Sequence, residues 1–367
     1  MASDVVRLLV NGLRYEGFES IRITRSIESI AGSFTLEVSD RWDGATDPWP
    51  IAEGDECKVL VGDDVVITGL IDKRRLSASA TTRTLGYDGR DRAGLLVDCS
   101  AIVDAGSVGK GGKWTFYNVN VAQLATEITK PFDIKVSVQA GLESLLTKHA
   151  KIVLHVGDSC FETIAKVAGA AGVLVVSDGA GGIVITRGGT ARAASLVEGQ
   201  NILAASTEMD ATDRFGRYLI SSQIPGTDDA SGEATRVLAE ATDPAVSAIR
   251  VLMIRPEKSY NAEDAKRRAD WEARIRAARA EKVTVTVQGW RQPSGALWTI
   301  NTLTRVRAPR LVGVDGDLLI SQVEFSVSAS GRTTQLSLVR PDAFTPEPTA
   351  TVRESGGAWK ELAKGAL

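Results

Sequence analysis

The sequence predicts an α+β protein that is mainly β, with two β-domains, an α/β domain between them and a helical insertion in the second. Three observations predict this class. Short alternating apolar runs, bounded by turn residues, fill the first hundred positions. The spacing then becomes helical, and alternating strands return near the end after one long Ala- and Arg-rich segment. Frequent glycine (35 residues) and sparse aromatics (5%) favour many turns and short strands.

Length and charge narrow the class of function. A chain of 367 residues has room for two or three domains, and its content of charged (24%) and hydrophobic (43%) residues is that of a globular protein. Lys and Arg (43) nearly balance Asp and Glu (46), which leaves a formal charge of −3. This balance argues against a uniformly basic nucleic-acid binder.

The cysteines and the apolar runs bear on where the protein is made. Cys57, Cys99 and Cys160 are too few and too scattered for a disulfide framework, and they favour a reducing cytoplasm. The N-terminus has no basic leader before a long apolar run, so we expect no signal peptide. No window of 18 apolar residues is present, so we expect no membrane insertion.

The first β-domain is expected over residues 1–97. The Asn11-Gly12 pair is the strongest short hairpin signal, and the turns recur at the spacing of a sandwich or barrel. The strands are expected at 6–10, 21–27, 34–38, 56–61, 65–71 and 83–87.

Residues 98–197 are expected to form the α/β middle domain. The apolar spacing from 121 to 128 predicts a helix that begins after Asn120 and ends before Pro131. Ser159 and Glu162 form a capping-box pattern at the start of a second helix. The apolar runs 173–176 and 183–186 flank a Gly-rich turn, which predicts a hairpin.

The second β-domain is expected from 198–225 plus 283–340, because neither stretch alone has enough strands to close. The segment between them, 226–282, is then a helical insertion whose long helix spans 261–282. Residues 341–367 hold three prolines and predict an extended C-terminal segment, with a short helix near Trp359.

The residues that most often carry catalysis have simpler interpretations here. His149 and His155 are six residues apart and lack a metal-ligand pattern or a Gly-x-Ser-x-Gly elbow, so we expect structural or surface roles. The Gly-rich stretches 109–113 and 179–182 do not match a phosphate-binding loop. Four acidic clusters could suggest glycoside hydrolysis or cation binding: Asp63-Asp64, Asp88 with Asp91, Asp228-Asp229, and Asp315 with Asp317. Asp63-Asp64 and Asp315 to Asp317 are expected between strands beside glycine, so turn chemistry accounts for these two.

The helix 261–282 allows two interpretations. Its arginines are suited to phosphate or to a charged partner. Alternatively, they pair with acidic residues of the same helix at helical spacing, in a helix exposed to solvent. This segment contains seven basic and five acidic residues. The excess of basic residues is small, so we favour the second interpretation.

An ordered series of segments carries the clearest functional signal. Together they resemble the baseplate hub proteins of Mu-like contractile-tailed phages, which are related to the hub part of type VI secretion spike proteins. The resemblance runs from about residue 5 to residue 348. The segments are GYDGRDRAGLLVDCS (86–100), VGDSCFETI (156–164), EGQNIL (198–203), DRFGRY (213–218), WEAR (271–274), QGWR (288–291), LW (297–298) and DLLI (317–320).

The resemblance implies a homotrimeric ring whose subunits each contribute two tail-tube-like β-barrels. Six barrels would adapt the sixfold tail tube to the threefold spike and continue the channel that passes DNA. The implied partners are the tail tube or tube-distal proteins, the trimeric spike and other baseplate proteins. The implied location is the virion tail baseplate, assembled in the host cytoplasm.

We therefore predict a structural protein with no catalytic activity, no cofactor and no metal. We take Arg274, Trp290 and Trp359 as candidate partner contacts. Two alternatives stay open at this point: a spike-associated cell-wall hydrolase, and a nucleic-acid-binding module that uses the Arg-rich helix 261–282.

Overall fold

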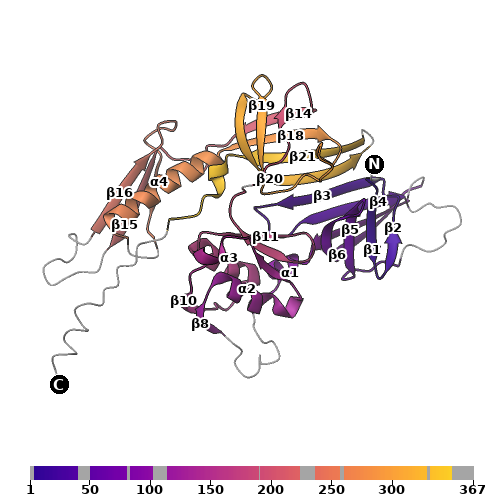
Figure 1. Ribbon diagram of the computed structural model, residues 1–367, viewed down its shortest axis with the longest axis horizontal. Helices are drawn as coiled ribbons and strands as arrows, with labels where there is room; N and C mark the ends of the chain where they lie inside the picture. Colours follow the sequence, from indigo (N-terminus) through magenta and orange to yellow (C-terminus); the bar gives the residue numbers. More distant parts are fainter. Residues whose placement is uncertain are drawn as a thin grey trace. The chain divides into compact units, whose positions relative to one another are not determined.

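The protein is described by a computed structural model, which is mainly β with a few helices, as predicted (Figure 1). It describes residues 4–39, 50–80, 83–101, 114–189, 191–223, 236–256, 260–328 and 331–348. The chain divides into two compact units, each treated by itself. Unit 1 comprises Met1–Met209 and Glu281–Pro346, and unit 2 comprises Asp210–Ala280 and Glu347–Leu367.

The first half of the unit 1 sheet is antiparallel, with strand order β3-β4-β7-β6-β5-β1-β2. Asn11 and Gly12 both have positive φ (52° and 77°), which is what the tight β1–β2 hairpin requires, so this predicted turn is confirmed. The strands are β1 (Val6–Val10), β2 (Leu13–Tyr15), β3 (Ser20–Ser26), β4 (Ser33–Ser39), β5 (Glu56–Val61), β6 (Asp64–Ala78) and β7 (Arg83–Asp91).

Two helices of the α/β part of unit 1 begin where the sequence predicts. Asn120 and Ser159 each cap a helix with a complete capping box, formed with Gln123 and Glu162. The predicted hairpin is β11–β12, and β9 pairs with β12 in parallel. The elements are α1 (Gly94–Asp98), β8 (Thr115–Val119), α2 (Val121–Thr129), η2 (Lys130–Phe132), β9 (Val136–Val138), η3 (Glu143–Leu145), β10 (His149–Val153), α3 (Cys160–Ala170), β11 (Leu174–Ser177) and β12 (Ile183–Thr186).

The β11–β12 turn anchors this α/β part on the first strands. Gly179 has φ +77°, and an added Cβ would lie only 2.5 Å from the Val66 carbonyl oxygen, so only glycine fits there. Arg25 donates a hydrogen bond of 2.8 Å to the Ser177 carbonyl oxygen. Asp91, which is buried, accepts hydrogen bonds from the backbone N–H groups of Gly32 and Ala93.

The second half of the sheet is built from residues 196–209 and 281–339, and β20 joins it to the first half. β20 pairs with β3, so that Phe325 lies opposite Ile23, and the buried side chains of both halves belong to one apolar cluster. The elements are β13 (Leu196–Val197), β14 (Ala204–Met209), β18 (Glu281–Gln288), β19 (Leu303–Ala308), β20 (Val314–Ser328), β21 (Gly331–Val339) and η5 (Pro341–Phe344).

Unit 2 is a small sheet with one helix on it (Figure 1). The strands are β15 (Arg217–Gln223), β16 (Arg236–Thr242) and β17 (Val251–Ile254), and the helix is α4 (Ala262–Arg279). β15 lies in the centre, antiparallel to β16 and parallel to β17. Ala265 and Ala269 of α4 pack in one apolar cluster with Ile220 and Ala239 of the sheet.

The expected composition of the second β-domain needs one correction. The stretch 198–225 was expected to pair with 283–340, and β14 does pair with β18. The strand 217–223 instead pairs with β16 and β17 of unit 2, so the helical insertion includes its own three-stranded sheet and begins near residue 210. The buried side of β15 packs against α4, because Ile220 belongs to one apolar cluster with Ala265 and Ala269. Among the described residues, no helix is both long and apolar enough to cross a bilayer.

We expect acid to weaken unit 2 through Asp243. Arg214 donates two hydrogen bonds to this carboxylate, at 2.5 and 3.1 Å, and they hold the pKa of Asp243 below its usual value. The pair therefore stabilises the fold above the ordinary carboxyl pKa of about 4, and the stabilisation is lost as the pH falls through the lowered value. Asp243→Asn should lower the free energy of unfolding at neutral pH by about 2–3 kcal/mol.

Denaturant unfolding of the full chain at a series of pH values tests this expectation. The Asp243→Asn variant should lose less stability between about pH 5 and pH 3 than the parent chain does. Asp213→Asn is the matched control, because Asp213 is exposed. Equal pH dependence of the parent chain and Asp243→Asn would contradict the assignment.

Candidate assembly surface

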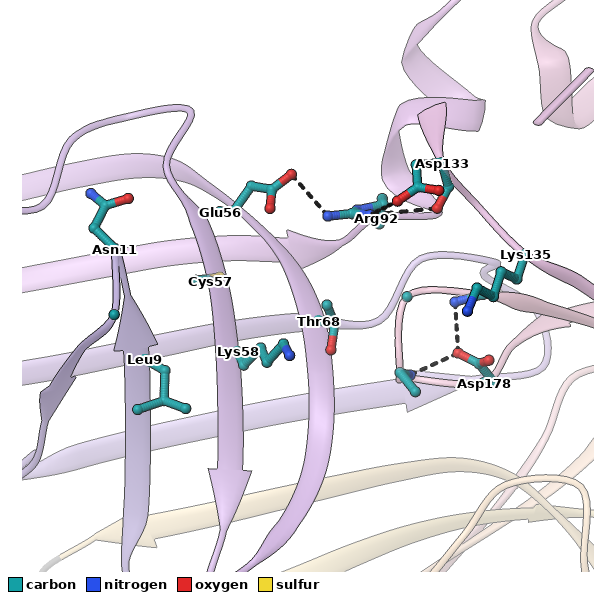
Figure 2. A pocket seen from close by; sticks show the side chains of 14 residues that line it. Leu9, Asn11, Glu56, Cys57, Lys58, Thr68, Arg92, Asp133, Lys135 and Asp178 are labelled. Atoms are coloured by element: carbon teal, nitrogen blue, oxygen red, sulfur yellow. Dashed lines mark hydrogen bonds and ion pairs between the residues drawn. The ribbon is translucent and has the colours of Figure 1, made fainter. Parts of the chain in front are cut away.

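A groove of about 750 Å³ opens between the first strands and the β11–β12 turn (Figure 2). Arg92 reaches Glu56 at 2.8 Å and Asp133 at 3.4 Å, so both carboxylates bind one guanidinium group. Asp178 accepts hydrogen bonds from the backbone N–H groups of Ala180 and Gly182. Ion pairing and turn hydrogen bonds therefore account for these carboxylates.

Cys57 also lines this groove, yet it is not an activated nucleophile. Its side chain is buried, and burial raises the pKa of the thiol to about 12. A reactive cysteine needs a lowered pKa, because the thiolate is the nucleophile. The groove thus lacks the environment that nucleophilic catalysis requires of a cysteine.

The two histidines lie apart from this groove. His149 begins β10, and His155 is exposed two residues after that strand ends. Within the described ranges, no group of three or more His, Cys, Asp or Glu residues is arranged to hold a metal ion.

The acidic clusters singled out in the sequence are engaged with arginines. Asp88 bonds to Thr35 and Arg75, while Asp228 and Asp229 lie outside the described residues. The clusters next to strand ends follow the same pattern, with the pairs Asp63–Arg7, Asp64–Arg291, Asp315–Arg305 and Asp317–Arg192. The expected turn chemistry fits Asp63, but it is wrong for Asp315 and Asp317, which lie within β20, and for Asp64, which begins β6. Ion pairs, rather than turns, account for these carboxylates.

The basic groups of α4 are largely neutralised within unit 2. Arg268 and Arg276 both bind Glu272, at 2.7 and 2.8 Å. The remaining pairs at helical spacing are Lys266–Asp270, Arg267–Asp264 and Arg267–Glu263. These pairs confirm the interpretation of α4 as a helix whose charges compensate one another, and they weaken the case for a phosphate-binding face.

The three predicted partner contacts lie in different environments. Arg274 is exposed on α4. Trp290 is fully buried in unit 1, so its side chain offers no surface to a partner; its indole N–H donates to the carbonyl oxygens of Ser326 and Thr333 instead. Trp359 lies outside the described residues.

The sequence analysis missed an apolar face of unit 2. Because side chains alternate along a strand, the residues opposite the α4 side share the other face of the sheet. Leu238 is 55% exposed there, Met253 56% and Val251 41%, and Leu219 lies next to Met253 in the strand register. We call Leu219, Leu238, Val251 and Met253 the outer face. The partly exposed Arg217–Glu240 ion pair, at 2.6 Å, lies on the same side.

Three family descriptions cover most of the chain. Residues 5–91 match the N-terminal domain of Mu phage baseplate assembly protein GpP-like, and residues 93–187 match the second domain of baseplate hub protein gp44-like. Residues 261–347 match the fourth domain of Mu phage baseplate assembly protein GpP.

Individual relatives agree with these matches. The chain is 29% identical over 348 residues to baseplate hub protein gp44 of Escherichia phage Mu, covering 93% of this chain and 89% of the relative. The 43 kDa tail protein of prophage MuSo2 from Shewanella oneidensis is 34% identical, with a TM-score of 0.79 over 92% of this chain and 99% of that chain.

A more distant structure shows the same fold. The E. coli c3393 protein, a component of the type VI secretion system, has a TM-score of 0.54 at 11% identity, over 94% of this chain and 80% of that chain. The relatives with higher identity are named as structural proteins of phage tails and baseplates. On this ground the chain is a structural protein and not an enzyme. By sequence and by structure, the chain belongs to the family of Mu-like phage baseplate hub proteins.

Proposed function

We propose that this chain is the subunit of a homotrimeric hub ring, which adapts the sixfold tail tube to the threefold spike in the baseplate of a contractile tail. The observation that carries the proposal is the construction of unit 1 from two β-modules. The strands β3-β4-β7-β6-β5-β1-β2 form the first module, and β14-β18-β21-β20 form the second. Three copies of such a subunit supply six modules, which is how a threefold ring matches a sixfold tube.

The junction between the modules supports their use as one rigid building block. Residues 322–327 of β20 pair in antiparallel fashion with residues 21–26 of β3, so the two modules share a continuous sheet. Their buried side chains also belong to one apolar cluster, in which Ile23 and Phe325 lie close to the seam. Continuous packing of this kind fixes the angle between the modules, as an adapter requires.

The proposed partners follow from this role. The ring would contact tail-tube or tube-distal proteins on one side, the trimeric spike on the other, and further baseplate proteins around it. DNA would only pass through the channel, which suits a mildly acidic chain with a formal charge of −3 because the conduit must not retain DNA. Subunits would assemble in the host cytoplasm and remain in the virion baseplate.

The outer face of unit 2 is the surface that we assign to contact between copies of the chain. Leu238 and Met253 are each more than half exposed on the same side of the sheet. Leu219 of the central strand pairs with Met253 and lies diagonally across from Leu238, so it connects the two. Contiguous exposed apolar patches on soluble proteins mark interaction sites. In a homotrimer, a neighbouring subunit would cover this face, and the adjacent ion pair between Arg217 and Glu240 would form part of a polar rim.

Light scattering coupled to size exclusion tests the oligomeric state directly. The proposal predicts a particle with three times the 39.0 kDa mass of the chain. A monomer at high protein concentration would contradict it. The same preparation should not clear a suspension of cell wall, and it should not retain DNA on a filter at low salt; either activity would instead support one of the alternatives raised by the sequence.

A further inference from the structure

Two of the three cysteines meet where α1 ends and α3 begins. Cys99 follows α1 in extended conformation, with φ −98° and ψ 141°, and Cys160 is the first residue of α3. Between them, Ser100 and Ser159 form an isolated antiparallel bridge. The Cys160 N–H donates to the Cys99 carbonyl oxygen at 2.9 Å, which ties the two cysteine backbones together.

The hydrogen-bond pattern defines how the cysteines face each other. The Ala101 N–H donates to the Asp158 carbonyl oxygen at 3.1 Å, so the bonds flank the Ser100–Ser159 pair on both sides. Cys99 and Cys160 are the next residues outward from this isolated bridge and share one backbone hydrogen bond, so their Cα atoms lie at roughly the 4.5–5.5 Å spacing of residues paired across strands. A disulfide accepts Cα separations of roughly 4.4–6.8 Å.

The two cysteine side chains belong to the same apolar region. Cys160 is buried in the apolar cluster of the α/β part, and Cys99 packs against that cluster. The Cys160 thiol donates to the carbonyl oxygen of Ser100 at 3.4 Å, so it is directed toward the segment that carries Cys99. Burial, together with the interaction with Cys99, raises the pKa of Cys160 to about 11.

We propose that Cys99 and Cys160 form an intramolecular disulfide when the protein meets a small-molecule disulfide such as oxidised glutathione. The thiolate of Cys99, the more exposed of the two, attacks the reagent and releases one reduced thiol, which leaves a mixed disulfide on Cys99. Because the pKa of Cys160 is raised, only a small fraction of it is thiolate at mildly alkaline pH, and the second step is slow. In that step the Cys160 thiolate attacks the neighbouring sulfur of Cys99 within the same molecule and releases the second reduced thiol. Two cysteine thiols are oxidised, and one reagent disulfide is reduced.

The bond would act as a redox-dependent staple of the α/β part. It would close the segment 99–160, which contains β8, α2, β9 and β10, and so restrict the unfolded chain. Reducing cytoplasm would keep both thiols free during assembly, while a particle released from the cell would meet oxidising conditions. Cys57 is buried in unit 1 and belongs to the other apolar cluster, so we expect it to remain a thiol.

Thiol counting on the full chain tests the proposal. After incubation with oxidised glutathione at mildly alkaline pH, acid quenching and denaturation, the number of free thiols should fall from three to one, and dithiothreitol should restore three. Peptide mapping should show Cys99 linked to Cys160. The oxidised chain should unfold at a higher temperature than the reduced chain.

Two variants provide the controls. Cys57→Ser should go from two free thiols to none under the same treatment, and it should keep the rise in unfolding temperature. Cys99→Ser should form no internal bond and show no rise. Three free thiols after oxidation, a glutathione adduct without an internal bond, a link between separate chains, or a bond that includes Cys57 would each overturn the proposal.

Discussion

Replacing Trp290 by alanine is expected to lower the free energy of unfolding of unit 1 by about 3–5 kcal/mol. The side chain is fully buried and lies edge-on to Phe325, with ring centroids 6.3 Å apart. Its N–H also supplies a hydrogen bond of 3.1 Å to each of two carbonyl oxygens, those of Ser326 and Thr333. Alanine would leave a cavity, and the two carbonyl groups would lose their hydrogen-bond donor.

Guanidinium unfolding followed by circular dichroism measures this loss. Trp290→Phe is the matched control, because it keeps an aromatic ring and removes the N–H, so its loss should be smaller, about 1–3 kcal/mol. A loss below about 1 kcal/mol for Trp290→Ala would contradict a structural role for this residue. Such a result would also reopen the original interpretation of Trp290 as a partner contact.

If the chain forms the proposed trimer, placing aspartates at both Leu238 and Met253 is expected to dissociate it. Each side chain is more than half exposed on the outer face of unit 2, so neither change should disturb the packing of α4 on the other side of the sheet. In an assembled interface, two carboxylates would replace apolar contacts and lose their hydration. The trimer dissociation constant should rise by about 100-fold or more.

Sedimentation velocity across a range of protein concentrations tests this expectation. Leu311→Asp is the matched control. Leu311 is also about half exposed (52%), but it lies in unit 1, and the substitution likewise replaces an apolar side chain by a carboxylate. Circular dichroism should be unchanged in both variants. Trimers that persist in the double variant would remove the outer face from the interface, and loss of trimers in Leu311→Asp alone would place the contact in unit 1.

Features determined over a few residues were predictable from the sequence. Asn11-Gly12 specifies its hairpin through positive φ, and Ser159 with Glu162 specifies a helix start through reciprocal hydrogen bonds. Strand partners were harder to assign. The alternation in 217–223 indicates a strand, but it does not say whether its buried side packs on the large sheet or on α4.

The outer face of unit 2 was also not predictable from local sequence. Leu238 belongs to β16, a strand within the segment 226–282 that was expected to be a helical insertion. Met253 is apolar like a core residue, and only the position of α4 on the opposite side shows that it is exposed. Trp290 illustrates the reverse case: a tryptophan expected at an interface is satisfied inside the fold by two backbone carbonyl groups.

The most direct test of the proposed role is electron microscopy of the purified full-length protein. The account predicts a ring of three subunits, in which each subunit's two β-modules are related by a rotation of about 60° around the ring axis, so that six modules surround the channel. A particle of different symmetry, or modules that such a rotation fails to superimpose, would contradict it.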